Sequence, residues 1–547
     1  MDAARKHQFF SSEISRRHFI AAASIAHASA RLLRVDAPPS IRLATDRHRP
    51  QYHLMPPANW MNDPNGPFQW GGRYHLFYQY ATAVSNTATK YWGHAVSSDL
   101  VHWKNLGIAL APTPGGPDQN GCWTGSAVVA NGVPTLIYTG ATWPASAVTE
   151  RAARAEGLIP ERQMVAISAD PEDPDQRKWV KIPQNPVLAA PPPGMKVIGW
   201  RDPALWKEAS TWYMIIGSGE HGIGGLALLY RSEDLRNWTY LHPLAIADRG
   251  SGQQTPSGPD ADMWECPDFF LLDGKPVLLV ARGNSYLRGT YSGHKFHQEF
   301  GGRIDFGAAY AQKTMEDEKG RRIWWGWIHE KRSMRAQAAA GWAGVMSLPK
   351  LLTLRSDGTL GIAPVPELAI LRGDAKRLAD REIMPNGPLL LEHFEGDCTE
   401  IEAEIELGNS RQAGLRVRST ADGSEQTLIG YDRDSQTLFS DTTNSSNDPE
   451  TISGSFLRAG RGVQSGVLKL DAGEALHLRI YLDASVIETF ANGRASISDR
   501  VYPASAASLG IGLFSRGGTA HLRSMIVWQL APISRDRLTS SAELYRV

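Results

Sequence analysis

The chain has 547 residues, more than one hydrophobic core usually holds, so two domains are expected. Lys and Arg together number 57 and so do Asp and Glu, which makes the formal net charge zero. This balance excludes the strongly basic proteins that bind nucleic acid and the acidic proteins with disordered interaction arms, so no nucleic-acid partner is expected.

The N-terminus has the pattern of an export signal. The stretch SRRHFIAAASIAHASA (15–30) holds a twin arginine, Arg16 and Arg17, then a short apolar run and an A-x-A site at its end. We expect a twin-arginine signal peptide over residues 1–30, with a periplasmic or extracellular mature chain; a disordered basic tail is the alternative. The apolar run is too short to span a membrane, and no later segment resembles a span.

One short apolar segment recurs behind a turn, which predicts a repeat architecture. Each copy continues with β-branched, aromatic and aliphatic residues, the composition of a buried strand. The five copies are GGRYHLFYQY (71–80), NGVPTLIYTG (131–140), STWYMIIGSG (210–219), LDGKPVLLVA (272–281) and KGRRIWWGWI (319–328).

A second motif, SSDLVHW (97–103), recurs as SEDLRNW (232–238) and more loosely as ADPEDPDQRKW (169–179). Repeats several tens of residues apart favour a radial array of small sheets, so we expect a five-bladed β-propeller over residues 45–370. A β-sandwich is the alternative, but its strands recur roughly every 8–12 residues, which is a shorter period than that of these repeats.

The pattern changes near residue 370. Runs such as TEIEAEIEL (399–407) and HLRIYLDASVIETFANG (477–493) alternate apolar and polar residues, as half-buried antiparallel strands do. We expect an all-β chain that ends in a β-sandwich over residues 375–547. This second domain either binds polysaccharide or packs against the propeller.

The segment WMNDPNG (60–66) contains more than a turn needs, because a Trp-Met pair leads into it and the carboxylate of Asp63 precedes a proline. Asp63, Asp202 and Glu265 lie at about the same distance upstream of their repeated strands, and each is flanked by a proline. In the second blade CWTGS (122–126) offers hydroxyl groups at this place. If the segment is the innermost strand of each blade, the three acids meet at the central channel.

Three converging carboxylates predict acid–base chemistry. Their mutual repulsion raises the pKa of one of them, which stays protonated near neutral pH. Glycoside hydrolysis needs such a pair of a protonated acid and an ionised carboxylate. Two alternatives are that each Asp-Pro is an ordinary turn or that the cluster binds Ca²⁺, although the nearby tryptophans and Arg201 favour a sugar.

These segments resemble glycoside hydrolase family 32, the β-fructofuranosidase family of invertases, inulinases, levanases and related fructosyltransferases. The resemblance runs from about Gln51 to the C-terminus and rests on WMNDPNG, WGHAVSSDLVHW, CWTGSA, WRDP, WECPDF and GWAGVMSLPK, which occur in the family's order. HLFYQY, RRIWWGWI and GWAGVMSLP are most similar to the plant acid invertase-like branch, here combined with a bacterial-type export signal.

The resemblance implies an O-glycosyl hydrolase that releases terminal β-D-fructofuranosyl units from sucrose or fructan ends with retention. Asp63 would be the nucleophile at the anomeric carbon C2, and Glu265 the general acid and then the general base. Asp202 would hold fructose hydroxyls and be kept ionised by Arg201. Retention requires the carboxyl groups of Asp63 and Glu265 to lie roughly 5–5.5 Å apart.

The resemblance also implies residues that contact the sugar. Amide and hydroxyl groups would bind fructose and tryptophans would line the pocket, with ordinary core packing as the alternative for the tryptophans. The expected residues are Trp60, Asn62, Gln79, Trp92, Trp123, Ser126 and Arg201.

Two departures from the family concern the leaving group. In ATAVSNTATKYWGHA (81–95), Thr87 stands near the place where plant-like members carry a tryptophan. Asn284 stands near the place where some plant members carry an acid that holds the leaving glucose. The choice among sucrose, inulin and levan is therefore open.

No metal or organic cofactor is implied, because a carboxylate nucleophile and proton transfer suffice. Three cysteines are too few and too scattered for a disulfide framework or a zinc site, so free thiols are expected, with one bridge at most. They are Cys122, Cys266 and Cys398. Alternative functions are transfer of the fructosyl unit to a sugar acceptor and carbohydrate binding without turnover.

Overall fold

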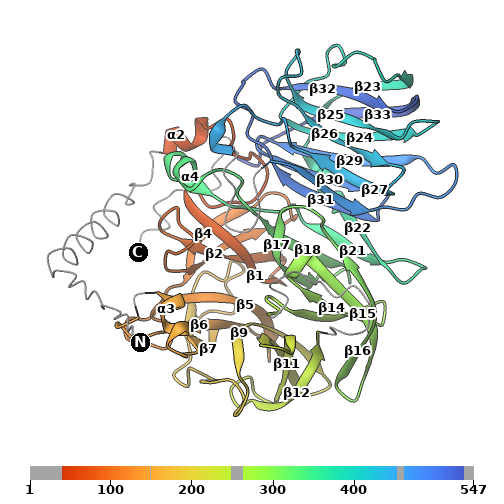
Figure 1. Cartoon of the computed structure of the whole chain (residues 1–547). Coiled ribbons are helices and arrows are strands. Elements are labelled where there is room, and N and C mark those ends of the chain that lie inside the picture. The colour runs from red at the N-terminus through yellow and green to blue at the C-terminus, as the bar shows by residue number, and fades with distance from the viewer. Residues whose placement is uncertain (1–39, 148, 248–262, 452–460, 535–547) are drawn as a thin grey trace, which may run out of the picture.

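The structure is a computed structural model that describes residues 40–147, 149–247, 263–451 and 461–534. These residues form two groups of β-sheets, one above the other in Figure 1, with short helices beside them. The predicted signal peptide lies outside the described residues, within which no helix has the length and apolar character needed to cross a membrane. The α-helices are α2 (Ser40–Thr45), α3 (Glu150–Ala155) and α4 (Met334–Ala340).

Five sheets make up the first group, and neighbouring strands in each are antiparallel except for the added strand β19. The first sheet contains β19 (Trp342–Ala343), β1 (Asn59–Trp70), β2 (Arg73–Ala81), β3 (Tyr91–Ser97) and β4 (Lys104–Leu110). The second contains β5 (Gly121–Ala130), β6 (Val133–Ala141), β7 (Glu161–Ser168) and β8 (Trp179–Lys181). The third contains β9 (Val197–Glu208), β10 (Thr211–Glu220), β11 (Gly224–Ser232) and β12 (Thr239–Ile246).

The remaining two sheets follow in chain order. The fourth contains β13 (Asp268–Leu272), β14 (Lys275–Val280), β15 (Ser285–Ser292) and β16 (Lys295–Arg303), and η1 (Arg282–Asn284) lies between its second and third strands. The fifth contains β17 (Ala309–Glu316), β18 (Arg322–Ile328), β20 (Val345–Met346), β21 (Lys350–Leu354) and β22 (Leu360–Pro364).

The first strands of the five sheets form a closed ring. β1 contacts β5, β5 contacts β9, β9 contacts β13, β13 contacts β17, and β17 contacts β1. Small antiparallel sheets placed radially around such a ring make a propeller, here with five blades, as predicted. The five repeated segments are confirmed as equivalent, because they form the second strands β2, β6, β10, β14 and β18.

The second repeated motif is a turn with one geometry in two blades. Asp99 and Asp234 each accept hydrogen bonds from the backbone N–H groups two and three residues later. The residues that follow them, Leu100 and Leu235, have φ angles of 68° and 62°. The aspartate therefore closes the turn that leads to the outermost strand of the blade.

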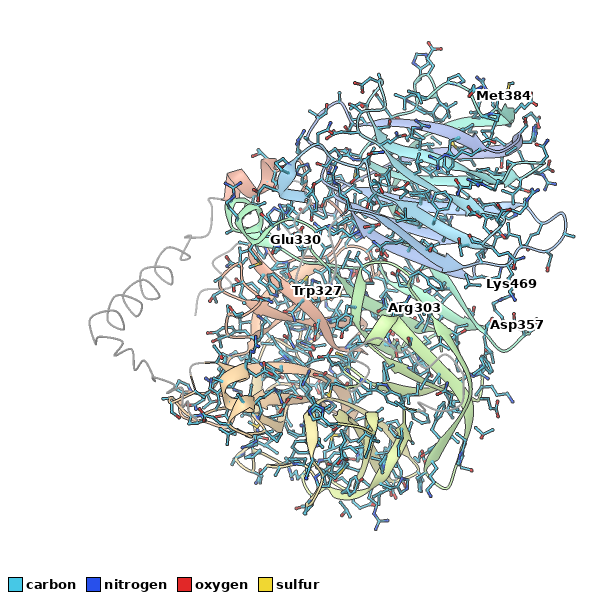
Figure 2. All side chains as sticks on the ribbon, viewed as in Figure 1. Arg303, Trp327, Glu330, Asp357, Met384 and Lys469 are labelled. Atoms are coloured by element: carbon cyan, nitrogen blue, oxygen red, sulfur yellow. The ribbon has the colours of Figure 1, made fainter. Side chains whose placement is uncertain are left out.

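The second group of sheets is the predicted β-sandwich. One sheet has the order β23-β33-β24-β29-β30-β31 and the other β28-β27-β26-β25-β32, with buried aliphatic side chains of both in one core. Figure 2 shows Met384, which follows β23, at the outer end of this domain. Its strands are β23 (Arg372–Ile383), β24 (Cys398–Glu406), β25 (Gln412–Ser419), β26 (Thr427–Asp432), β27 (Thr437–Asp441), β28 (Val463–Val467), β29 (Leu476–Asp483), β30 (Val486–Ala491), β31 (Ala495–Arg500), β32 (Gly510–Arg516) and β33 (Ala520–Leu530).

Buried charges join the two groups of sheets. The Lys350 ammonium donates to Asp305 at 2.7 Å and lies 3.0 Å from Glu488. His53 contacts Glu488 at 3.1 Å and Asp483 at 2.7 Å, and all five side chains are fully buried. Removing one member would leave an uncompensated buried charge, so this network makes the junction sensitive to substitution.

Candidate active site

Asp63 and Asp202 lie at β-bulges in the first half of innermost strands. In β1, Asn62 and Asp63 together face the single residue Gln79 of β2. In β9, Asp202 and Pro203 together face a single residue of β10, and the φ angle of Asp202 is 66°. A bulge bends the strand and redirects the side chains at that point, which accounts for an Asp-Pro inside a strand.

Glu265 lies three residues before β13, although we expected it within the innermost strand. The preceding residue, Trp264, holds this segment against the third blade, because its backbone N–H donates to the carbonyl oxygen of Ser218 at 3.0 Å. Its ring covers Gly225, where a Cβ atom would lie 2.1 Å from the indole. Packing of Trp264 therefore places Glu265 at the entrance of the ring instead of inside the sheet.

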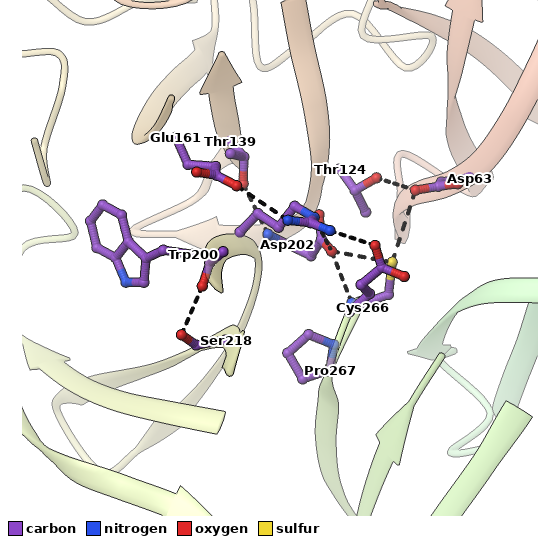
Figure 3. A network of polar contacts seen from close by, with 12 residues as sticks. Asp63, Thr124, Thr139, Glu161, Trp200, Asp202, Ser218, Cys266 and Pro267 are labelled. Carbon is purple, nitrogen blue, oxygen red and sulfur yellow. Dashed lines mark hydrogen bonds and ion pairs between the residues drawn. The ribbon is translucent and has the colours of Figure 1, made fainter. Parts of the chain in front are cut away.

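The contacts of Cys266 show that the three predicted carboxylates lie close together. Its backbone N–H donates to Oδ2 of Asp202 at 3.0 Å, and its thiol lies 3.5 Å from the same oxygen. The thiol is also 3.9 Å from Oδ2 of Asp63, and Glu265 is the adjacent residue (Figure 3). Side chains separated by more than two hundred residues thus share one site, at the end of the ring where β1 and β9 begin.

A chain of hydrogen bonds orients Asp63. Thr124 donates from its hydroxyl to Oδ2 of Asp63 at 2.5 Å and accepts from Nε2 of Gln79 at 2.5 Å. Asn62 donates to Oδ1 of Asp63 at 3.0 Å, and Trp60 donates to the Asn62 side chain at 2.9 Å. Burial raises the pKa of Asp63, and the hydrogen bonds from Thr124 and Asn62 only partly offset this effect.

Arg201 links the acids of two blades. Its Nη2 donates to Oε1 of Glu265 at 2.5 Å, its Nη1 donates to Glu161 at 3.2 Å, and its Nε lies 3.9 Å from Asp202. The hydroxyl of Tyr310 donates to the other oxygen of Glu265. The Glu161 carboxylate, fully buried in β7, therefore anchors the guanidinium that reaches Glu265.

Arg201 lowers the pKa of Asp202, as expected, but does not keep this carboxyl fully ionised at neutral pH. Burial is the largest effect and leaves the pKa of Asp202 raised to about 7, and the charges of Asp63 and Glu265 also raise it. Burial also raises the pKa of Glu265, but the charge of Arg201 and the hydrogen bond from Tyr310 reverse the shift and the net pKa is lowered. Below about pH 7, Asp202 therefore carries a proton.

Comparison with known proteins agrees with the fold. Residues 53–364 match the family described as "Glycosyl hydrolases family 32 N-terminal domain", and residues 367–529 match "Glycosyl hydrolases family 32 C terminal". The chain belongs to glycosyl hydrolase family 32. The predicted place of this family 32 chain in the plant acid invertase-like branch stays a prediction.

Several relatives of this family 32 chain match over most of their length. A sucrose-6-phosphate hydrolase of Escherichia coli is 34% identical over 88% of this chain and 94% of its own. A levanase of Bacillus subtilis is 33% identical over 89% of this chain and 71% of its own. The solved structure of fructan 1-exohydrolase IIa from Cichorium intybus superimposes with a TM-score of 0.77 at 27% identity, covering 89% of this chain and 98% of that one.

Four of the residues predicted to contact sugar lie beside the carboxylates. Asn62, Gln79 and Arg201 are hydrogen-bonded or ion-paired to them, and Trp60 supports Asn62. The exposed fraction of Trp60 is only 3%, so most of its ring packs in the protein.

Trp92 does not line the pocket, contrary to the prediction. It is fully buried, its N–H donates to Trp123 O at 2.9 Å, and its ring packs against Phe77 and Tyr138. It is therefore a core residue beneath Trp123, as the core-packing alternative predicts. Trp123 itself is half-buried, which leaves part of its ring open to solvent.

Ser126 is a further correction, whereas Asn284 was predicted only as a departure from the family. Ser126 donates to Pro203 O at 2.7 Å and lines a different cavity, of about 540 Å³, to which none of the three carboxylates contributes. Asn284 is buried, with an exposed fraction of 2%, and donates to Ala309 O at 2.5 Å. Its side chain thus supports the backbone next to Tyr310 and does not face a leaving group.

Four residues of the site were absent from the predicted set. The sequence did point to Thr124, because CWTGS (122–126) carries hydroxyl groups at the position where other blades carry a carboxylate. Cys266, predicted only as a structural thiol, contacts two of the acids. Glu161 had no signal, because it lies in β7, the third strand of its blade. Tyr310 lies in the innermost strand β17, but no carboxylate or proline marks the position in that blade.

Proposed function

We propose that this family 32 protein is a β-fructofuranosidase that hydrolyses terminal β-D-fructofuranosyl units from sucrose or fructan ends. The observation that carries this proposal is the meeting of Asp63, Asp202 and Glu265 around Cys266 and Arg201. The relatives named above support it, as does a variant of the Cichorium intybus fructan 1-exohydrolase IIa solved in complex with 1-kestose, which has a TM-score of 0.76. A terminal fructosyl unit is the group that these names have in common.

The reaction takes two displacements. Asp63 attacks C2 of the fructosyl unit while Glu265 gives its proton to the leaving oxygen, so the C2–O bond breaks and a bond from C2 to the Asp63 carboxylate forms. Water then attacks C2, Glu265 takes a proton from it, and the Asp63 carboxylate leaves. Two inversions give retention. The carboxyl separation of roughly 5–5.5 Å that retention requires stays a prediction.

From the hydrogen bonds to Glu265 we also infer how this acid acquires its proton. Glu265 has to carry a proton when the leaving oxygen departs, yet Arg201 and Tyr310 stabilise its ionised form. A sugar oxygen that displaces the Tyr310 hydroxyl removes one of these donors and raises the pKa of Glu265. Asp202, whose pKa is about 7, can donate as well as accept a hydrogen bond to a fructose hydroxyl.

Product analysis on sucrose, inulin and levan in parallel tests the function. We expect free fructose from at least one of them and, by NMR at early times, β-fructofuranose as the first anomer released. An inverted first anomer would overturn the two-displacement mechanism. Abundant oligofructosides at high sucrose concentration would show that transfer dominates, and no product from any of the three would favour a binding propeller without turnover.

We also propose export through the twin-arginine route. The support is the pair Arg16 and Arg17 followed by an apolar run and an Ala28-Ser29-Ala30 site. In a bacterium with this route, the mature protein should begin at or near Arg31, as measured by N-terminal mass spectrometry. Replacing both arginines by lysine should retain the protein in the cytoplasm with residues 1–30 attached, and unchanged export of that variant would contradict the proposal.

A further inference from the structure

Lys90 closes a loop on the face of the propeller that holds the carboxylates. The β2–β3 loop, residues 82–90, runs from the end of β2 to the start of β3. β1 begins on the same face, because it is antiparallel to β2, and Asp63 is close to its start. The loop therefore borders the mouth of the proposed active site.

The ammonium of Lys90 organises this loop. Its Nζ donates to the carbonyl oxygens of Asn86 at 2.8 Å, Ala88 at 2.9 Å and Ser85 at 3.5 Å. The residue is 8% exposed, and among the described residues no carboxylate lies within ion-pair distance of it. Three carbonyl oxygens thus accept hydrogen bonds from one buried amine, whose pKa is lowered to about 7 by burial. They would lose this donor if the side chain were removed.

The loop contacts two of the tryptophans at the site. Val84 and Ala88 pack against the cluster that contains Trp60 and Trp327, and Lys90 Nζ lies 5.7 Å from the centre of the Trp60 ring. Figure 2 shows Trp327 inside the propeller, below the junction of the two domains. This aromatic cluster lies directly beside Asn62, which receives a hydrogen bond from Trp60.

The other end of the loop reaches the second blade. The carbonyl oxygen of Lys90 accepts from the backbone N–H of Cys122 at 2.9 Å, and the next residue is the half-buried Trp123. The loop therefore spans the mouth from Trp60 to Trp123. A fructosyl unit whose C2 lies over Asp63 has to direct its leaving group out through this mouth, because the innermost strands enclose the site on the other sides.

We propose that Lys90 is a specificity-determining residue, which holds the β2–β3 loop in the shape that receives the leaving group. This inference rests on the proposed β-fructofuranosidase activity. Lys90 acts through the loop and touches no reacting atom, so it is a positioning residue. Its loss should weaken binding of a large leaving group and spare a small one.

Comparison of two substrates tests this inference. Sucrose has a glucosyl leaving group that reaches the mouth, whereas methyl β-D-fructofuranoside has only a methoxy group. For Lys90→Met we expect KM for sucrose to rise about tenfold or more with kcat within threefold, and kcat/KM for the methyl fructoside to stay within threefold. Lys90→Arg, which keeps the charge and the donors, should restore KM for sucrose to within threefold of wild type. Lys104→Met, an exposed lysine of β4, is the matched control.

Each other outcome has a definite meaning. Equal loss on both substrates would overturn the inference and show that Lys90 acts on the chemistry, for instance through its charge near Asp63. Unchanged kinetics on both substrates would also overturn it. If Lys90→Met does not fold, as judged by its thermal unfolding, the same comparison on Lys90→Gln decides. Wild-type protein that turns over neither substrate would instead contradict the proposed function.

Discussion

Arg201 and Glu265 are joined by a hydrogen bond of 2.5 Å that runs from the innermost strand of the third blade to the segment that enters the fourth. The same guanidinium lies 3.9 Å from Asp202, which the sequence had suggested as its main partner. The guanidinium therefore stabilises the ionised form of the predicted general acid. Glu161 fixes the guanidinium from behind.

Arg201→Lys should lower kcat/KM for sucrose by about 10²-fold or more. A lysine is a point charge that cannot contact Glu265, Glu161 and Asp202 at once, so the geometry of the acid is lost. Steady-state kinetics measure this, with Arg231→Lys on the exposed side of β11 as the control. A variant within threefold of wild type would show that Arg201 does not position Glu265.

Tyr310→Phe should move one limb of the pH profile. The hydroxyl of Tyr310 lowers the pKa of Glu265 by donating to its carboxylate, so removing it raises that pKa. A hydrogen bond to a charged group is worth about 1.5–3 kcal/mol, which corresponds to a shift on the order of one pH unit. The limb of kcat/KM against pH that reports Glu265 should move to higher pH while the other stays. Two unmoved limbs would contradict the role of Tyr310.

Thr124→Val should impair the nucleophile. The Thr124 hydroxyl lowers the pKa of Asp63, and its loss should raise the pKa of Asp63 further and release the side chain from its orientation. We expect a decrease of about tenfold in kcat, since one hydrogen bond to a charged group is lost. Thr124→Ser keeps the hydroxyl and should restore most of the rate. Equal kinetics of the valine and serine variants would rule out the hydrogen bond as the cause.

The pattern of residues in the sequence was sufficient to predict the architecture and the three acids. A turn followed by a buried apolar run identifies the second strand of every blade, so the slot upstream of it locates Asp63 and Asp202 without any knowledge of contacts. Glu265 occupies the same slot but lies outside the strand, because the packing of Trp264 on Gly225 overrides strand pairing there. Packing of one large side chain is not visible in a repeat pattern.

The partners of the acids could not be predicted in the same way. Arg201 precedes Asp202 in sequence, and this adjacency favoured an ion pair between them. Neighbouring residues in a strand point to opposite faces, and the Arg201 guanidinium reaches Glu265 of the next blade. Trp92 was also predicted wrongly. Its ring is buried against Tyr138 of the second blade, and the sequence does not show that contact.

The junction between the domains should depend on pH through His53. Burial lowers the pKa of His53, but its hydrogen bonds to Asp483 and Glu488 outweigh this effect, so the net pKa is raised above 6.5. A group with a raised pKa contributes stability that is complete below its unfolded value and is lost as the pH rises through the folded value. The pKa of Glu488 is lowered from 4.5 to about 2, so its contribution is lost as the pH falls towards 2.

His53→Gln should therefore destabilise the protein most between about pH 5 and 6, by about 3 kcal/mol, because it removes the cation beside buried Asp483 and leaves Glu488 with Lys350 alone. The difference from wild type should shrink as the pH rises above the folded pKa of His53. Thermal unfolding of both proteins across this range measures the effect, with the exposed His221→Gln as the control. A difference that grows with pH would contradict a protonated His53.

The initial rate of fructose release from sucrose by Asp63→Ala tests directly whether Asp63 is the group that attacks the sugar. Asp170→Ala, an exposed aspartate that also precedes a proline, is the matched control. The rate of Asp63→Ala should fall by about 10⁴-fold or more while the control keeps the wild-type rate. Release of fructose by Asp63→Ala at a rate within tenfold of wild type would contradict the account.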